Sequence, residues 1–242
     1  MVIFLILGAY ACIAADFEDM TAAELVKRVE TQYQGKTAHA VSRMKVVTEN
    51  WTREMKLETW SEGRDTFLAR ILRPKKDQGI ATLRIEDDMW NYIPKIDRLI
   101  KIPSSLMGDS WMGSHLTNDD IVKENKIEDL YDLTASMSPD GIATVIGIPK
   151  PDAAIVWGRL EYNIDMEKLI PVSTLYYDED GALVRTMSFD GVEQIDGRWL
   201  PLRMMIQPED EPEEYTEFVY ETMEFDIKLK KNLFSVRSLR DR

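Results

Sequence analysis

The sequence predicts a mainly β (α+β) protein, built as an antiparallel, unclosed β-barrel of about eleven strands with short helices that cover an apolar cavity. Three observations predict this class. Apolar and polar residues alternate with a period of two through most of the chain, turn signals separate these runs at short intervals, and one stretch near the N-terminus has helical spacing. The strand runs far outnumber the helices, so a sheet must form most of the molecule.

The first fifteen residues, MVIFLILGAYACIAA, carry no charged side chain and end in small residues. This apolar run is too short to span a bilayer, and it is typical of a secretory signal peptide. We therefore predict a signal peptide over residues 1–15 and one domain over residues 16–242. Cleavage would remove Cys12, the only cysteine, so the mature chain would have no thiol, disulfide or cysteine-bound metal.

The helical stretch is MTAAELVKRVETQYQG, at residues 20–35. Thr21 is placed to cap it with Glu24 three residues later, Leu25 and Val29 recur at helical spacing, and Gly35 ends it. We expect a short helical turn near Leu116–Val122 as well, with Asp119 and Asp120 at its N-terminal end.

The clearest strand is RLEYNIDM, residues 159–166, in which Leu160 and Tyr162 fall on one face and Glu161 falls on the other. Turn signals follow at Glu62–Gly63, Pro139–Gly141, Asp180–Gly181 and Asp196–Gly197. Hairpins of this kind join neighbouring antiparallel strands. A curled sheet of so many strands needs more cover than one helix supplies, which is why we expect an under-filled interior.

Composition excludes several classes of function. The net charge of −13 argues against nucleic-acid binding and against broad adsorption to anionic lipid surfaces. His39 and His115 are far apart and have no metal-ligand spacing, and no nucleophile elbow, phosphate loop or dinucleotide fingerprint is present. We therefore predict neither an enzyme nor a cofactor or metal site.

The segment SSLMGDSWMGSH, Ser104–His115, interrupts the strand pattern with two Met-Gly pairs, a leucine and a tryptophan. Two interpretations stay open. The segment is either a loop packed on its own core or a mobile apolar flap over a ligand, for which glycines give freedom and methionines give adaptable contact.

Residues 88–121, DMWNYIPKIDRLIKIPSSLMGDSWMGSHLTNDDI, resemble the signature of the LolA-like outer-membrane lipoprotein-sorting proteins. The matching residues are Trp90, Tyr92, Pro94, Arg98, Ser104, Ser105, Met112, Gly113, Ser114 and Asp120. The resemblance continues through residues 171–189 and closes with residues 232–239, so it covers nearly the whole mature chain.

The resemblance implies a monomeric periplasmic carrier that takes acyl chains of a lipoprotein or lipid toward the outer membrane, with an RND/MMPL-type inner-membrane permease or an outer-membrane acceptor as partner. By rough alignment Arg64 falls near the arginine that holds the family's lid closed. The residues that we expect in the cavity and flap are Met55, Leu57, Leu83, Ile85, Trp90, Tyr92, Leu106, Met107, Trp111, Met112, Leu160, Tyr162 and Met204.

A second hypothesis stays open beside the carrier. LolA-like folds also serve as periplasmic sensors that bind a membrane-anchored regulator or an envelope component, and the run from Glu209 to Glu224, with eight acids and no base, offers a docking edge for such a partner. The plainer interpretation of that run is a solvated edge of the sheet.

Overall fold

A computed structural model describes residues 17, 19–123, 126–153 and 155–240. The predicted signal peptide and Cys12 lie outside the described residues. Among the described residues, no helix has the length and apolar character needed to cross a membrane.

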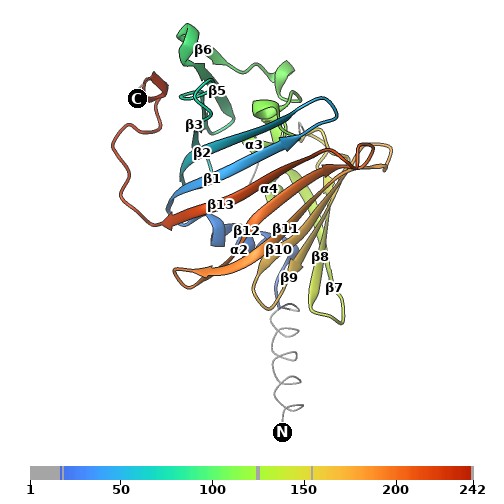
Figure 1. Cartoon of the computed structure of the whole chain (residues 1–242). Coiled ribbons are helices and arrows are strands. Elements are labelled where there is room, and N and C mark those ends of the chain that lie inside the picture. The colour runs from blue at the N-terminus through green and yellow to red at the C-terminus, as the bar shows by residue number, and fades with distance from the viewer. Residues whose placement is uncertain (1–16, 18, 124–125, 154, 241–242) are drawn as a thin grey trace.

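The molecule is organised around one antiparallel sheet of thirteen strands (Figure 1). The first six strands, in chain order, are β1 (Thr37–Val47), β2 (Thr52–Glu62), β3 (Thr66–Arg73), β4 (Ala81–Ile85), β5 (Asp88–Ile93) and β6 (Arg98–Lys101). The other seven are β7 (Tyr131–Met137), β8 (Ile142–Pro149), β9 (Arg159–Asp165), β10 (Ile170–Tyr177), β11 (Leu183–Ile195), β12 (Arg198–Pro208) and β13 (Tyr215–Phe225).

The strands form two meanders that meet at the centre of the sheet. Strands β1 to β6 follow one another in space, β7 to β13 do the same, and β1 pairs with β13 in a register that matches Ala38 with Phe225. Strands β6 and β7 are left as the two edges, so the barrel is unclosed, as the sequence predicts.

The predicted number of strands, about eleven, is too low. The extra strands are separated by turns that lack the usual glycine signal. Glu86, Asp97 and Leu169 take positive φ angles of 54°, 44° and 53° between β4 and β5, β5 and β6, and β9 and β10. Because non-glycine residues rarely adopt this conformation, the sequence gives little warning of these turns.

Helix α2 (Ala22–Gln34) begins as the sequence predicts. The Thr21 hydroxyl accepts a hydrogen bond from the Glu24 amide at 3.2 Å, and the Glu24 carboxylate accepts one from the Thr21 amide at 2.9 Å, which completes a capping box. Leu25, Val26 and Val29 are buried, so one stripe of the helix faces the sheet.

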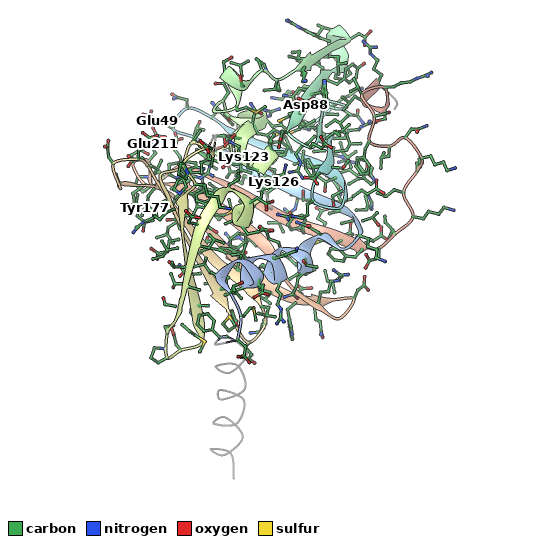
Figure 2. The ribbon with its side chains drawn as sticks, turned by 180° about the vertical axis from the view of Figure 1, so that it is seen from behind. Glu49, Asp88, Lys123, Lys126, Tyr177 and Glu211 are labelled. Carbon is green, nitrogen blue, oxygen red and sulfur yellow. The ribbon has the colours of Figure 1, made fainter. Side chains whose placement is uncertain are left out.

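A long connector, residues 102–130, joins the two sheet edges by running from β6 to β7. It contains the short 3-10 turns η2 (Ser104–Leu106) and η3 (Trp111–Gly113) and the helices α3 (Asn118–Lys123) and α4 (Ile127–Leu130). Figure 2 views the sheet from behind, with α2 in blue and the yellow-green helices of the connector in front of it, near the labelled Lys123 and Lys126. Both segments cover the same face, which we call the inner face.

The inner face carries Met44, Met55 and Leu57 on one half of the sheet and Tyr162 and Ile164 on the other. The opposite, outer face bears charged ladders over β1, β2 and β13, for example Lys56 beside Glu221 at 2.6 Å. One face of the sheet is apolar and the other is charged and solvated, which agrees with the alternation of apolar and polar residues along the sequence.

Strands β3 to β5 depart from that arrangement because both of their faces are dry. Their outer face carries Leu68 and Leu83, which pack beneath a C-terminal segment, residues 226–240, that includes the buried Leu239. Figure 1 shows this segment leaving β13 and running up beside β3 to β5. The expectation of one wet and one dry face is therefore wrong for these strands.

Candidate functional site: the covered inner face

Trp111 is the centre of the connector's contact with the inner face. Its side chain is 2% exposed, its indole N–H donates to the Thr82 hydroxyl at 3.1 Å, and its ring stacks on Phe218 with 6.4 Å between ring centroids. The connector's Leu116, Ile121 and Val122 are buried in the same cluster. The segment Ser104–His115 thus matches the packed-loop interpretation in this structure.

The Met-Gly-Ser signature forms a tight turn that lowers Trp111 into the core. Met112 and Gly113 have φ angles of 52° and 75°, and the Ser114 amide and hydroxyl both donate to the Trp111 carbonyl, at 2.9 and 2.7 Å. Arg53 of β2 donates to the Met112 carbonyl at 3.0 Å. This part of the signature therefore encodes the geometry of a loop.

Asp120 and Arg185 make a buried ion pair that fixes α3 to β11. Two guanidinium nitrogens of Arg185 reach the two carboxylate oxygens of Asp120 at 2.6 and 2.8 Å, and Arg185 also donates to the His115 carbonyl at 2.9 Å. The guanidinium lies over the rings of Trp157 and Tyr176, 4.4 and 4.2 Å from their centroids. Bidentate geometry and ring stacking are what arginine offers and lysine does not.

The electrostatics of this pair follow from its burial. Burial opposes ionisation of Asp120, but the adjacent Arg185 guanidinium outweighs it and holds the pKa of the Asp120 carboxyl below its usual value. Asp120 also accepts hydrogen bonds from the Thr117 amide and hydroxyl at 2.7 and 2.9 Å. At its neighbour Asp119, by contrast, burial raises the pKa.

Two further polar contacts hold the connector. The buried Arg84 of β4 donates to the Val122 carbonyl at 2.9 Å. His115 contacts β13 through its amide and ring, which lie 3.0 and 2.8 Å from the Thr216 hydroxyl, and its ring also lies 3.2 Å from Glu214. The connector is thus bound to the inner face by side chains from strands in both meanders.

The second cover, α2, lies over β7 to β9. Its Leu25, Val26 and Val29 pack against a buried cluster of Ala143, Val145, Tyr162, Ile164 and Met166. Tyr162 is buried in this cluster, and burial raises the pKa of its phenol well above its usual value.

The polar attachments of α2 to the sheet gather at its C-terminal end. Gln32 donates to the carbonyls of Lys168 and Leu169 at 3.1 and 2.5 Å, and Arg198 donates to the carbonyls of Thr31 and Gln32 at 3.4 and 3.3 Å. Farther along, Gly35 at φ 55° joins α2 to β1.

Arg64, in the turn between β2 and β3, lies between the two covers. Its guanidinium is 2.8 Å from Glu128 and 3.5 Å from Asp129 of α4, and 4.0 Å from the buried Glu30 of α2. One cation of the sheet therefore faces carboxylates on both helices.

The structure separates the predicted ligand residues into three buried or packed groups and one exposed residue. Met55, Leu57, Met107, Trp111, Met112 and Met204 belong to the connector half of the inner face or pack against it, and Leu160 and Tyr162 are buried on β9, with Tyr162 in the cluster beneath α2. Leu83, Ile85, Trp90 and Tyr92 pack instead with the C-terminal segment on the outer face, and Leu106 is 41% exposed.

The inner face carries packed side chains where the sequence predicts an apolar cavity. Two surface depressions, of about 500 and 750 Å³, lie away from this face: one along the exposed side of α2 near Lys27, the other around Arg43, Lys56 and Glu221. The side chains of the connector and α2 fill the inner face because each brings its own buried apolar residues to it.

Sequence reasoning missed Arg185 and its aromatic partners. A signal was available in β11, where Arg185 shares its parity with Met187 and Phe189, which pack into the inner-face cluster. A charged residue at a dry position of an alternating strand indicates a buried partner. Among the described residues, no three His, Asp or Glu side chains are arranged to bind a metal ion.

The fold is an unclosed antiparallel half-barrel, and a helix and a connector cover its inner face. Comparisons with known proteins show which structural class this fold belongs to. A family model described as "Uncharacterized protein" matches residues 63–241. The chain belongs to that family. No curated protein matches the chain.

Three solved structures share the fold over nearly their full length. A DUF1329 family protein from Desulfovibrio piger has a TM-score of 0.81 at 22% identity, covering 90% of this chain and 97% of its own. A putative outer membrane lipoprotein-sorting protein domain from Vibrio parahaemolyticus has a TM-score of 0.75 at 21% identity, covering 90% and 98%. A LolA superfamily protein from Nitrosomonas europaea has a TM-score of 0.72 at 16% identity, covering 89% and 98%.

These likenesses establish the fold. The chain has the same fold as these proteins, one of which is described as a LolA superfamily protein, so the LolA-like fold that the resemblance implied is confirmed.

Proposed function

We propose that the protein is a periplasmic, non-enzymatic carrier that binds acyl chains of a lipoprotein or lipid on the inner face, beneath α2, and moves them toward the outer membrane. In this proposal residues 1–15 are removed as a signal peptide and residues 16–242 act as one monomeric domain without a cofactor. An inner-membrane permease or an outer-membrane acceptor exchanges the cargo.

The observation that carries the proposal is the way α2 is attached. Its apolar stripe of Leu25, Val26 and Val29 covers a dry surface on β8 and β9, yet its polar contacts to the sheet lie at its C-terminal end. A helix held in this way is suited to pivot about Gly35 and to expose the surface around Tyr162.

Acyl chains are the ligand class that fits such a surface. Each methylene gains about 0.8 kcal/mol on leaving water, so a sixteen-carbon chain needs about 12 kcal/mol of protection during transport. Replacing the side chains of α2 by acyl chains keeps the inner face dry. The energy of lifting α2 limits the net affinity, which allows release at a membrane.

Arg64 is suited to hold the closed state, as the family resemblance implies. It faces Glu30 on α2 and Glu128 on α4, so an outward movement of α2 would take Glu30 away from this guanidinium. Because these groups are partly buried, the ion pairs are screened less than fully exposed ones.

The alternative, a sensor that docks a regulator on the acidic run, receives little support from the geometry. Glu214 contacts His115, Glu217 lies 2.6 Å from Arg203, and Glu221 lies 3.2 Å from Arg43. These acids are paired with bases of neighbouring elements, as expected of the solvated face of a sheet, and β13 lies at the centre of the sheet and not at an edge.

Two matched variants test the binding surface. Ala143→Leu adds bulk beneath α2, and Ala69→Leu adds the same bulk beneath the connector; both alanines are fully buried. Overpacking costs each variant about 1–3 kcal/mol of stability. We expect Ala143→Leu to weaken binding of a fluorescent long-chain fatty acid about tenfold and Ala69→Leu to leave it nearly unchanged.

Mass spectrometry of an organic extract of the protein purified from its own periplasm identifies the cargo. Acylated species at near-stoichiometric amounts are expected. An extract without acyl chains, together with equal probe binding by the two leucine variants, would reject the carrier proposal.

A further inference from the structure

Three elements that are distant in the sequence meet at one end of the molecule. Pro94, in the hairpin between β5 and β6, lies against Gly79 of the loop between β3 and β4, and Asp97 of the same hairpin lies 3.1 Å from Arg240 at the C-terminus. We call this end the basic tip and define it by Lys75, Lys76, Lys95, Ile96, Arg98, Arg237 and Arg240. Figure 1 shows β6 and the C-terminal end together at this extremity.

The basic side chains of the tip are directed to solvent and mostly lack acidic partners. All six are exposed, and five of them, all except Arg240, have no carboxylate within 4.0 Å in the part of the chain that the structure describes. The C-terminal segment that leads to the tip adds the exposed Lys228, Lys230 and Lys231. Such unpaired positive charge in a chain of net charge −13 is a strong local asymmetry.

An exposed apolar residue lies within this charge. Ile96 is 63% exposed, the highest value among the exposed large apolar side chains of the described residues, and it lies directly between Lys95 and Asp97 at the end of the hairpin. Nothing in the fold of the hairpin requires isoleucine there, since the turn itself is made by Asp97 in the left-handed conformation.

Basic side chains around a protruding apolar residue match the surface of an anionic bilayer. Lysine and arginine are attracted to anionic headgroups, at about a fivefold gain in affinity for each residue that reaches the surface, and an apolar side chain adds contact with the acyl boundary. An acidic protein partner would use the charge but would leave Ile96 without a matching environment.

We propose that the basic tip docks the protein, in one orientation, on a membrane that contains anionic phospholipids. The overall negative charge excludes broad adsorption but not this contact, because the Debye length of about 8 Å at physiological salt screens the distant acids. The role of the contact, to hold a carrier at its donor or acceptor membrane, rests on the proposed function. Docking itself is measured separately from acyl-chain binding.

Co-sedimentation with vesicles tests the proposal on the mature full-length protein. We expect binding to vesicles of phosphatidylethanolamine with phosphatidylglycerol, little binding to phosphatidylcholine alone, and loss of binding at high salt. The variant K75E/K95E should weaken binding at least tenfold. The control K27E/R28E makes the same change of net charge on the exposed side of α2, and it should leave binding nearly unchanged.

Ile96→Asp separates membrane contact from simple charge attraction. It should weaken vesicle binding several-fold without altering binding of a fluorescent fatty acid. Equal loss in both charge-reversal variants, or no vesicle binding by the wild type, would overturn the proposal. So would concentration-dependent self-association that K75E/K95E abolishes, since the tip would then bind the acidic run of a second copy. Failure of fatty-acid binding alone would reject the carrier and leave the docking contact in place.

Discussion

The two covers of the inner face are held in different ways. The connector is fixed at its middle by the buried tryptophan Trp111 and by Arg185, whose guanidinium binds both carboxylate oxygens of Asp120. Helix α2 packs mainly through an apolar stripe, with the buried Glu30 facing Arg64 beside it, and its hydrogen bonds to the sheet lie near its C-terminal end at Gln32. Sequence alone left open whether Ser104–His115 is a mobile flap or a packed loop, whereas the contacts favour α2 as the cover that moves.

This difference follows from the strength and geometry of the two attachments. Removing the connector would leave the Arg185 guanidinium buried without its carboxylate, which is costly in a low-dielectric interior. Moving α2 exposes apolar surface, and an apolar ligand restores that loss. An opening that a ligand compensates is the one that a carrier needs.

The largest effect should come from Trp111→Ala. The substitution leaves a cavity beneath the connector and removes the hydrogen bond to Thr82, so the free energy of unfolding should fall by about 4 kcal/mol, as measured by urea titration. Leu106→Ala, in the same segment but 41% exposed, should change it by less than about 0.5 kcal/mol. If both substitutions lower the free energy of unfolding by similar, small amounts, Trp111 does not anchor the connector and the flap interpretation stands.

Asp120→Asn should lower the free energy of unfolding by about 3 kcal/mol, because it leaves Arg185 buried without a counter-charge. Its matched control is Asp119→Asn on the preceding residue, where burial raises the pKa and the loss of charge should cost less than about 1 kcal/mol. Two variants of equal stability would contradict the anchoring role of Asp120.

The pH dependence of Asp120→Asn has a definite sign. The pKa of Asp120 is lowered in the folded protein, so its charge stabilises the fold above the ordinary carboxyl range, and this contribution is lost as the pH falls through the folded value. The stability difference between wild type and variant should be full at neutral pH and should shrink below about pH 4. If the stability difference between wild type and Asp120→Asn grows as the pH falls, the pKa of Asp120 is not lowered by folding.

Amide hydrogen exchange compares the covers without a mutation. The amides of α2 should exchange through local opening at a free energy at least about 1 kcal/mol below that of the Trp111, Ser114 and Leu116 amides, whose partners are carbonyl or hydroxyl groups within the connector. If the α2 amides exchange more slowly than these connector amides, the connector is the cover that moves.

A small change in stability, at most about 1 kcal/mol, should come from Arg64→Ala, because the arginine is partly exposed. Arg64→Ala should change the affinity for ligand more than it changes the stability of the fold. Loss of the contacts with Glu30 and Glu128 favours the open position of α2, so affinity for a fluorescent fatty acid should rise several-fold. Arg159→Ala, which removes a base from the outer side of β9, is the control and should leave affinity unchanged.

Local patterns were enough to predict the elements whose signals lie within a few residues. The capping box at Thr21 and Glu24 and the alternation of Leu160 and Tyr162 around Glu161 appear where the sequence indicates them, and the short helical turn expected near Leu116–Val122 appears as α3 at Asn118–Lys123. Each depends on contacts between near neighbours, which spacing in the sequence reports directly.

What the sequence concealed depends on distant segments. Leu83 and Ile85 alternate like cavity residues, yet they lie on the outer face because residues 226–240 return to cover them. The pair of Asp120 with Arg185 spans 65 residues, so no spacing rule connects the two. Parity defines which residues share a face, but only the fold defines which face is inside.

The pairing of β1 with β13 has a consequence for how the protein is made. Ala38 and Phe225 are neighbours at the middle of the sheet although almost the whole chain separates them, so the two meanders join only after the last strand has been synthesised. Contacts of such high sequence separation fold slowly because a long loop must close before they form. A chain emerging from the ribosome therefore stays incompletely folded until its last strand, β13, has been made.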